Sequence, residues 1–368
     1  MDGTSLGVEE EFQIIDRTTG ELVPRSDELV PAARRSLGDQ VTAELNRCQV
    51  ETATVVCADL GEVRAELVRL RSGLDRAAGA IGCGILPLAT HPWSSWRDQQ
   101  VEDDRARFRE MEDRYQRVAR QQVICGCHIH VGIDDPDRVV EVMTRVRPWI
   151  PVLLALSANS PYWNGEDTGY DSYRLEVWER WPTAGMPPEL ADRAAYDGVV
   201  DELRDADAIE DATHLYWYLR PSDTFPTLEF RATDVCLDID TAVGVAGLAR
   251  GLVRTCLADA RAGKAAGTAS PELLGAALWR AARYGLGGEL VSPLTGVPLP
   301  AAEVVGELLA WVGDALDELG DRETVTGLAD AILTEGNGAR RQREARARRG
   351  DPADVVALGR AGFLTPAD

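Results

Sequence analysis

Positive charge is scarce in this 368-residue chain. Its 39 lysine and arginine residues face 61 aspartate and glutamate residues, so the net charge is −22. An acidic surface repels the phosphates of nucleic acids and the headgroups of anionic lipids. We therefore expect neither nucleic acid nor a membrane surface as a partner. Nucleotides are not excluded, because local arginines and metal ions can neutralise their phosphates.

Long apolar runs are also missing. No uninterrupted run approaches the roughly 20 residues of a membrane-spanning helix, and the first residues carry no basic and apolar leader. The seven cysteines are an odd number without the spacing of a disulfide framework, which is typical of a reducing compartment. These features predict a cytoplasmic globular protein, and 45% hydrophobic residues suffice for a sizeable core.

The chain shows no internal repeat, no Walker A loop and no dinucleotide fingerprint. Hydrophobic periodicity predicts strands at 6–15, 44–57, 82–89, 123–133, 214–219 and 227–234, and helices at 26–37, 58–81, 103–122 and 138–158. Residues 159–185 form a loop-rich aromatic stretch. Because strands and helices do not alternate regularly, the pattern favours the α+β class with a largely antiparallel sheet. We expect a single domain, 1–368, whose helical C-terminal portion covers about 241–368.

The first predicted strand carries two carboxylates on one face. Glu9 and Glu11 share that face, whereas Val8, Phe12 and Ile14 lie on the other. The pair could belong to the solvated face of an edge strand. It could also bind a divalent cation, because hard cations take clustered carboxylate oxygens.

A second pair of carboxylates, Glu44 and Glu51, is seven residues apart. In a fully extended chain about 23 Å would separate them, which is too far for one cation cluster. They converge only if the chain turns between them, and Asn46 is a plausible place for that turn.

Two of the four histidines lie two apart in an apolar strand. His128 and His130 share one face, and Cys125 and Cys127 share the other, so one tetrahedral zinc site could not use all four. A buried imidazole needs a hydrogen-bond partner or a metal. We therefore expect a ligand or metal role for at least one of the two histidines.

Two arginines stand beside other candidate groups. Glu229 and Arg231 share a strand face, where they form either a simple ion pair or part of a metal-bound phosphoryl site. Arg174 follows a series of aromatic residues and either binds a substrate carboxylate or lies stacked on a ring at the surface.

Together these motifs resemble one bacterial family, the type 2 glutamate–cysteine ligases, also called carboxylate–amine ligases. Each motif alone is weak, but their order is specific, and the match runs from about residue 5 to residue 345. The motifs are Gly7-Val-Glu-Glu-Glu11, Glu44 with Glu51, His128 with His130, Ser160-Pro-Tyr-Trp-Asn-Gly165, Thr168-Gly169, Arg174, Glu229-Phe-Arg231 and Gly336-Asn-Gly-Ala-Arg-Arg-Gln-Arg343.

The resemblance implies a glutamine-synthetase-like catalytic fold, a curved and mostly antiparallel sheet flanked by helices with the site on its concave face. It implies ATP and Mg²⁺ or Mn²⁺ as cofactors. It implies metal ligation by Glu9, Glu11, Glu44, Glu51, His128 and Glu229. By the same resemblance, Arg231 contacts the transferred phosphoryl group, Arg174 contacts a substrate carboxylate or phosphate, and His130 is a cofactor-binding ligand or a residue behind one.

The function that the resemblance implies is ATP-dependent amide formation, of the γ-glutamyl type, through an acyl phosphate. Glutamate and cysteine are the reference substrates, small molecules that would be the main partners, and a homo-oligomer stays open. The aromatic stretch 159–181 is a candidate lid over the site. Two alternatives remain: the same chemistry on another carboxylate and amine, and a metallohydrolase built on His128 and His130, for which only His91 and His214 could supply further imidazoles.

Overall fold

The structure is a computed structural model and describes residues 5–103, 105–267 and 269–364. Within these residues, one seven-stranded sheet runs through the middle of the molecule. Six strands follow the order β2-β3-β1-β5-β9-β8, and β4 pairs with the last residues of β1, from Gln13 to Asp16. Every pair of neighbouring strands described in it is antiparallel. Its strands are β1 (Leu6–Asp16), β2 (Val41–Ala43), β3 (Gln49–Ala53), β4 (Cys83–Leu86), β5 (Cys127–Gly132), β8 (Leu219–Pro221) and β9 (Thr227–Phe230).

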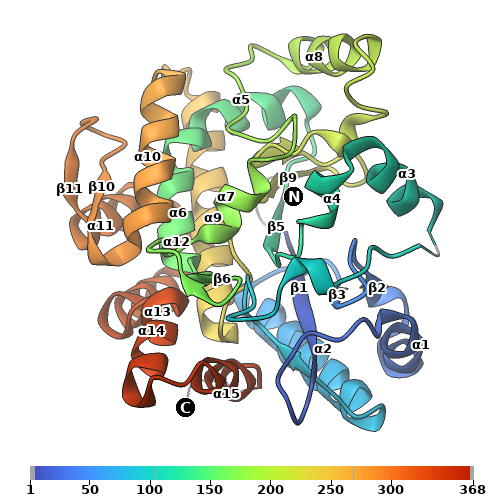
Figure 1. The fold of residues 1–368 in the computed structure, drawn as a ribbon. Helices are drawn as coiled ribbons and strands as arrows, with labels where there is room; N and C mark the ends of the chain where they lie inside the picture. The colour runs from blue at the N-terminus through green and yellow to red at the C-terminus, as the bar shows by residue number, and fades with distance from the viewer. Residues whose placement is uncertain (1–4, 104, 268, 365–368) are drawn as a thin grey trace.

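Helices flank this sheet, and two small hairpins lie outside it (Figure 1). The hairpins are β6 (Tyr162–Trp163) with β7 (Glu166–Asp167), and β10 (Glu289–Val291) with β11 (Pro298–Pro300). The helices are α1 (Ser26–Leu37), α2 (Leu60–Ala80), α3 (Ala106–Tyr115), α4 (Arg117–Arg120), α5 (Pro136–Val146), α6 (Ile150–Ser157), α7 (Tyr173–Trp178), α8 (Arg193–Asp205), α9 (Ile239–Arg261), α10 (Pro271–Tyr284), α11 (Ala301–Trp311), α12 (Gly313–Leu319), α13 (Arg322–Glu335), α14 (Gly338–Arg349) and α15 (Ala353–Gly362).

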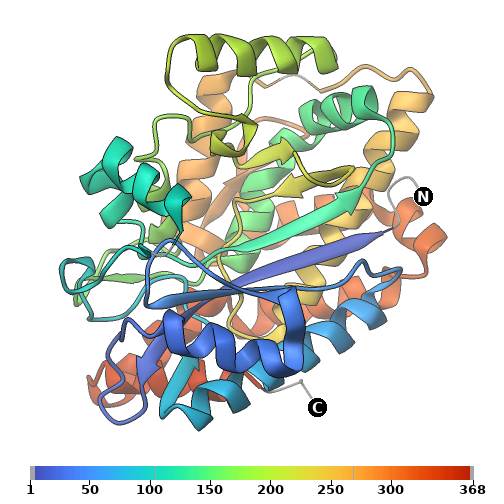
Figure 2. The same ribbon diagram turned by 90° about the vertical axis from the view of Figure 1, so that its right-hand side faces the viewer.

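One face of the sheet is covered by α1 and α2, which lie below the strands in Figure 2. Helix α2 forms there because its leucine and valine residues recur at helical spacing and are buried along one side. Asp59 caps its start by accepting a hydrogen bond from the Glu62 amide at 2.9 Å. The predicted helix 58–81 is confirmed to within two residues at each end.

Helix α9 is the central helix of the core and packs against α2, α5, α6 and α13. By length and composition it is the one described helix that passes a test for crossing a membrane, but 83% of its apolar window is buried inside the molecule. Its apolar character is therefore explained by core packing. From α9 to the last described residue, the strands of the β10–β11 hairpin are the only described strands, and the other regular elements are helices.

The α+β class and the mostly antiparallel sheet are confirmed. Several predicted boundaries are wrong, because tertiary contacts override local periodicity. Of the expected strand 44–57, only β3 (Gln49–Ala53) is a strand; residues 44–48 connect it to β2, and this turn includes Asn46, as anticipated. The helix expected at 103–122 breaks at Gln116, whose φ is +51°. The helix expected at 138–158 divides into α5 and α6 near Pro148 and Pro151, as predicted.

Candidate active site

The register of four strands places the candidate side chains in one row across the sheet. Glu11 of β1 lies opposite Glu51 of β3, and Glu9 of β1 lies opposite His128 of β5. On the far side of β5, His130 lies opposite Glu229 of β9. Alternation along each strand brings these side chains to one face. The sheet thereby joins residues that are up to 220 positions apart in sequence.

His128 is at the centre of this row. Its Nδ1 lies 3.3 Å from Glu9 Oε2 and 4.0 Å from Glu229 Oε1, and its Nε2 lies 3.8 Å from Glu11 Oε1. Two groups of ligand atoms result, each within 4.8 Å: Glu9, His128 and Glu229, and Glu11, Glu51 and His128. Both groups use the same imidazole, and a neutral imidazole has only one free lone pair. His128 can therefore ligate directly in only one of the two groups.

Four of these carboxyl groups fall into two pairs whose pKa values shift in opposite directions. Burial, together with the charges of Glu9, Glu44 and Glu11, raises the pKa of Glu51 well above its ordinary value. Burial and the charge of Glu11 raise the pKa of Glu44 to about 8. When ionised, Glu44 and Glu51 would place negative charge close to other carboxylates without enough positive charge from the protein to balance it. A bound divalent cation would reduce this repulsion.

Glu9 and Glu229 are neutralised within the protein. Burial opposes ionisation of Glu9, but hydrogen bonds from His128 and His130 outweigh it and lower the pKa of this carboxyl. Burial likewise opposes ionisation of Glu229, and the charges of Arg231 and Arg220 lower its pKa well below the ordinary value. Arg220 Nε donates to Glu229 Oε2 at 2.8 Å, and Arg231 Nη1 donates to Glu229 Oε1.

The row forms one wall of a cavity of about 350 Å³. Trp178, Trp181 and Tyr216 form an aromatic part of its lining, with the Trp181 and Tyr216 rings stacked at 4.6 Å. Arg105 and Arg107, at the start of α3, also line it. The cavity thus combines a carboxylate and imidazole wall with an aromatic wall and several guanidinium groups.

The predicted site residues are largely brought together. Glu9, Glu11, Glu44, Glu51, His128, His130, Glu229 and Arg231 all line the cavity. Glu44 belongs to neither three-residue group, and its role as a metal ligand stays a prediction. His130 also lies outside both groups; its Nδ1 is 2.8 Å from Thr227 Oγ1 and its Nε2 is 3.4 Å from Glu9 Oε1.

Arg174 does not line the cavity. It is 1% exposed, and its guanidinium donates to the backbone oxygens of Arg231 and Ala232 at 3.3 to 3.4 Å. The predicted contact with a substrate carboxylate or phosphate is therefore corrected, because the guanidinium is buried behind the site.

The predicted lid is also corrected. Of the stretch 159–181, Asn159, Ser160 and Tyr162 are buried, and Ser160 Oγ donates to Asp234 at 2.7 Å. Only Trp178 and Trp181 of this stretch line the cavity. The buried part of the segment is therefore a packed wall, because Ser160 and Ser172 both donate to the buried Asp234 carboxylate.

The sequence reasoning missed Arg220, Arg105 and Arg107. Arg220 is buried beside Glu229 and its Nη1 donates to the Thr213 carbonyl at 2.8 Å. No local motif marks this arginine, since its partner belongs to the neighbouring strand β9. The pairing across strands was the only signal that could have found it.

The donor set fits a hard divalent cation. The described groups contain carboxylate oxygens and one imidazole but no cysteine, a combination that suits Mg²⁺ or Mn²⁺ better than structural zinc. His128 Nε2 is buried without a hydrogen-bond partner, as expected for a nitrogen available to a metal. The alternative hydrolase loses its further imidazoles, because neither His91 nor His214 lines the cavity. His91 Nε2 instead lies 2.9 Å from the Gly20 carbonyl oxygen.

Comparison with known proteins identifies the family to which this chain belongs. The model of the glutamate–cysteine ligase family 2 matches residues 5–357. A Streptomyces coelicolor protein named "Putative glutamate–cysteine ligase 2" is 44% identical over 96% of this chain and 97% of its own length. A Nocardia farcinica protein, "Putative glutamate–cysteine ligase 2-1", is 41% identical over 97% of this chain and 92% of its own length. The chain belongs to the glutamate–cysteine ligase family 2 and is a ligase of that family.

Two solved structures share the fold at low sequence identity. Glutamate–cysteine ligase of Francisella tularensis, solved in complex with AMP, has a TM-score of 0.73 at 13% identity, over 98% of this chain and 89% of that one. A bifunctional glutathione synthetase of Pasteurella multocida has a TM-score of 0.70 at 15% identity, over 98% of this chain and 52% of that one. The glutamate–cysteine-ligase-like fold is thereby confirmed.

Proposed function

We propose that this protein joins a carboxylate to an amine at the expense of ATP, with glutamate and cysteine as the first substrate pair to test. The observation that carries the proposal is the row of carboxylates around His128, which adjoins the Glu229–Arg231 pair in one cavity. Family membership supports the same reaction class.

A carboxylate does not react with an amine directly, because oxide is too poor a leaving group, so the carboxylate must first be activated. Transfer of the γ-phosphoryl group of ATP forms a bond between a carboxylate oxygen and phosphorus, and ADP leaves. The amine then attacks the acyl carbon, the carbon–oxygen bond to phosphate breaks, and the amine nitrogen loses a proton. Amide, ADP and phosphate are the products.

The protein would position and neutralise the reacting groups. Glu9, Glu11, Glu51, His128 and Glu229 would hold divalent cations, which supply positive charge at the phosphates when bound. Arg231 lies against Glu229 at the cavity wall, where its guanidinium would contact the transferred phosphoryl group. The aromatic wall of Trp178, Trp181 and Tyr216 would exclude water from the acyl phosphate.

The test is an isotope experiment with glutamate that carries ¹⁸O in its γ-carboxylate. Incubation with ATP, Mg²⁺ and cysteine is expected to yield ADP, an amide detected by mass spectrometry, and inorganic phosphate that carries one ¹⁸O atom. Label in AMP would show adenylylation instead. Amide formed without ATP would contradict the ligase proposal.

Substrate identity is tested in the same assay with other pairs of carboxylates and amines, read as amine-dependent phosphate release. Arg231→Gln is expected to lower kcat by about 10²–10³-fold, since it removes a donor to the developing charge. Arg97→Gln is the matched control, because Arg97 is exposed and lies outside the cavity lining. Phosphate release without an amide for every pair tested would also contradict the proposal.

A further inference from the structure

We propose that Arg174 is a positioning residue that holds Arg231 and Glu11 in place from behind the cavity. The inference rests on the proposed function, because it assigns these two residues to the phosphoryl group and to a divalent cation. Arg174 touches neither group itself, and it acts through the backbone and the ring that its guanidinium contacts.

The first contact is with the segment that carries Arg231. Arg174 Nη2 lies 3.3 Å from the Arg231 carbonyl oxygen, and Nη1 lies 3.3 Å from that of Ala232. Both residues follow directly after the last residue of β9. The guanidinium thus holds the backbone just beyond the end of β9. The position of this backbone determines where the Arg231 side chain enters the cavity wall.

The second contact is with the backbone that orients Glu11. The Gly126 amide donates to Glu11 Oε2 at 2.6 Å, and the Glu11 amide donates to the Gly126 carbonyl at 3.0 Å. A Cβ atom at Gly126 would lie 2.3 Å from Arg174 Nη2. The guanidinium therefore packs directly against Gly126, and only glycine leaves room for it.

A shared ring links the two arginines. The guanidinium carbons of Arg174 and Arg231 lie 5.3 and 5.2 Å from the centre of the Trp178 ring. The ring is held in place because Trp178 Nε1 donates to the Tyr216 carbonyl at 2.8 Å. Displacing Arg174 would therefore disturb the surface on which the Arg231 guanidinium rests.

The buried charge of Arg174 is balanced locally. Asp234 Oδ1 lies 4.0 Å from Arg174 Nη1, and Asp234 accepts hydrogen bonds from Ser160 Oγ at 2.7 Å and Ser172 Oγ at 2.9 Å. This network could serve stability alone. A purely stabilising role and a positioning role make different predictions. Only with a positioning role should loss of Arg174 impair cation binding and kcat in molecules that remain folded.

The experiment uses Arg174→Lys, which keeps the charge but loses the planar fork. We expect kcat to fall about 10- to 100-fold with the KM for ATP near the wild-type value, and the Kd of Mn²⁺ for the substrate-free protein to rise about tenfold. Mn²⁺ binding is followed by electron paramagnetic resonance, and the folded fraction by thermal unfolding. Wild-type kcat and Mn²⁺ affinity, or losses equal to the unfolded fraction, would overturn the proposal.

A double-mutant cycle tests the contact with Gly126. Gly126→Ala is expected to lower kcat and Mn²⁺ affinity as Arg174→Lys does, because its methyl group displaces the guanidinium. In the Arg174→Ala background that space is free, so adding Gly126→Ala should cost nothing further. Losses that multiply in the double variant would overturn the proposal.

Failure of the ligase function would look different. If the wild-type protein makes no amide from any pair, the function fails while the Mn²⁺ measurements still test the placement of Glu11. If the wild-type protein makes the amide and Arg174→Lys matches it in both readouts, only the positioning role fails.

Discussion

At the scale of single residues, Glu51 and Glu44 both carry a raised pKa, but only Glu51 shares a group of ligand atoms with His128. The backbone explains the difference. Glu51 lies within β3 opposite Glu11, whereas Glu44 follows the end of β2 and its carboxylate accepts a hydrogen bond from the Leu45 amide at 3.1 Å.

We predict that Glu51→Gln weakens Mn²⁺ binding by at least about tenfold, since it removes a ligand oxygen. Glu44→Gln is the matched control and is expected to change the Mn²⁺ Kd little. Isothermal titration of both variants with Mn²⁺ measures the difference. Equal weakening in the two variants would place Glu44 among the ligands.

At this scale the sequence named most of the carboxylates and imidazoles that the fold brings to the cavity wall, but not the buried position of Arg174. Carboxylate and imidazole pairs on alternating strand positions could be recognised because their faces follow from period-two geometry. Arg174 could not be placed, since a guanidinium beside aromatic residues fits a cavity wall and a buried network equally well. Its neighbours, Gly126 and Asp234, are distant in sequence.

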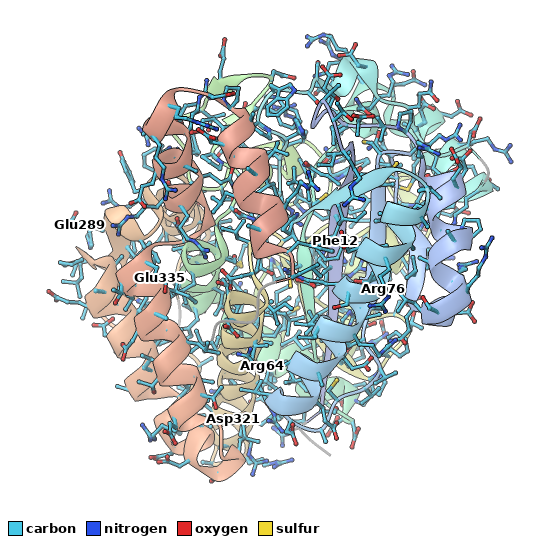
Figure 3. All side chains as sticks on the ribbon, turned by 90° about the horizontal axis from the view of Figure 1, so that it is seen from below. Phe12, Arg64, Arg76, Glu289, Asp321 and Glu335 are labelled. Atoms are coloured by element: carbon cyan, nitrogen blue, oxygen red, sulfur yellow. The ribbon has the colours of Figure 1, made fainter. Side chains whose placement is uncertain are left out.

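At the scale of elements, a buried ion pair joins β1 to α2. Glu10 points away from the cavity, and its carboxylate bonds Arg71 at 2.9 and 2.5 Å, with both side chains fully buried. Arg71 Nη2 also donates to the Cys236 carbonyl at 3.0 Å, and its guanidinium lies 5.3 and 5.5 Å from the Phe12 and Phe363 ring centres. Phe12 is visible between α2 and the C-terminal helices in Figure 3.

We predict that Arg71→Met lowers the free energy of unfolding by about 3–5 kcal/mol, because it leaves the Glu10 carboxylate buried without its partner. Urea unfolding measures this loss. The double variant Glu10→Leu with Arg71→Met should recover much of it, since no charge stays unpaired. Arg76→Met on the exposed side of the same helix is the control, with an expected change within about 0.5 kcal/mol. A similar effect for both single variants would contradict the role of the ion pair.

Element types were easier to predict than element ends. The 26–37 helix matches α1 residue for residue, because an apolar stripe at helical spacing has few competing interpretations. The strand expected at 214–219 is wrong: Ala212–His214 is a 3₁₀ turn and β8 starts only at Leu219. Leu215, Tyr216, Trp217 and Tyr218 are buried in a segment that is not a strand. An apolar pattern alone cannot distinguish such a buried loop from a strand.

At the scale of the whole molecule, the site imposes a pH dependence on folding. The folded protein holds protons on Glu44 and Glu51 above the ordinary carboxyl pKa of 4.5, and the pKa of Glu44 reaches about 8. Between these values the two carboxyl groups bind more protons in the folded state than in the unfolded state. Their contribution to the free energy of unfolding should therefore fall as pH rises through this window.

We predict this fall in the presence of EDTA, measured as the urea midpoint from pH 6.5 to pH 8.5. Burial lowers the pKa of His91 to about 4, so below pH 6.5 this group acts in the opposite direction. Glu229 does not oppose the fall in the measured range, because its lowered pKa places its contribution below pH 4.5. Saturating Mg²⁺ should flatten the curve, since a bound cation favours the ionised carboxylates and binds only the folded state. Glu44→Gln should flatten part of it without metal. An unchanged midpoint across the range in EDTA would contradict the prediction.

The sequence by itself determined the fold class, the strand faces of Glu9, Glu11, His128 and Glu229, and the family, because each depends on local period or on the order of motifs. Tertiary structure alone decided that Glu11 meets Glu51, that His128 lies between two groups of carboxylates, that Arg220 neutralises Glu229, and that Arg174 lies behind the site. Strand register and the packing of distant segments set those contacts, and neither is encoded in the spacing of neighbouring residues.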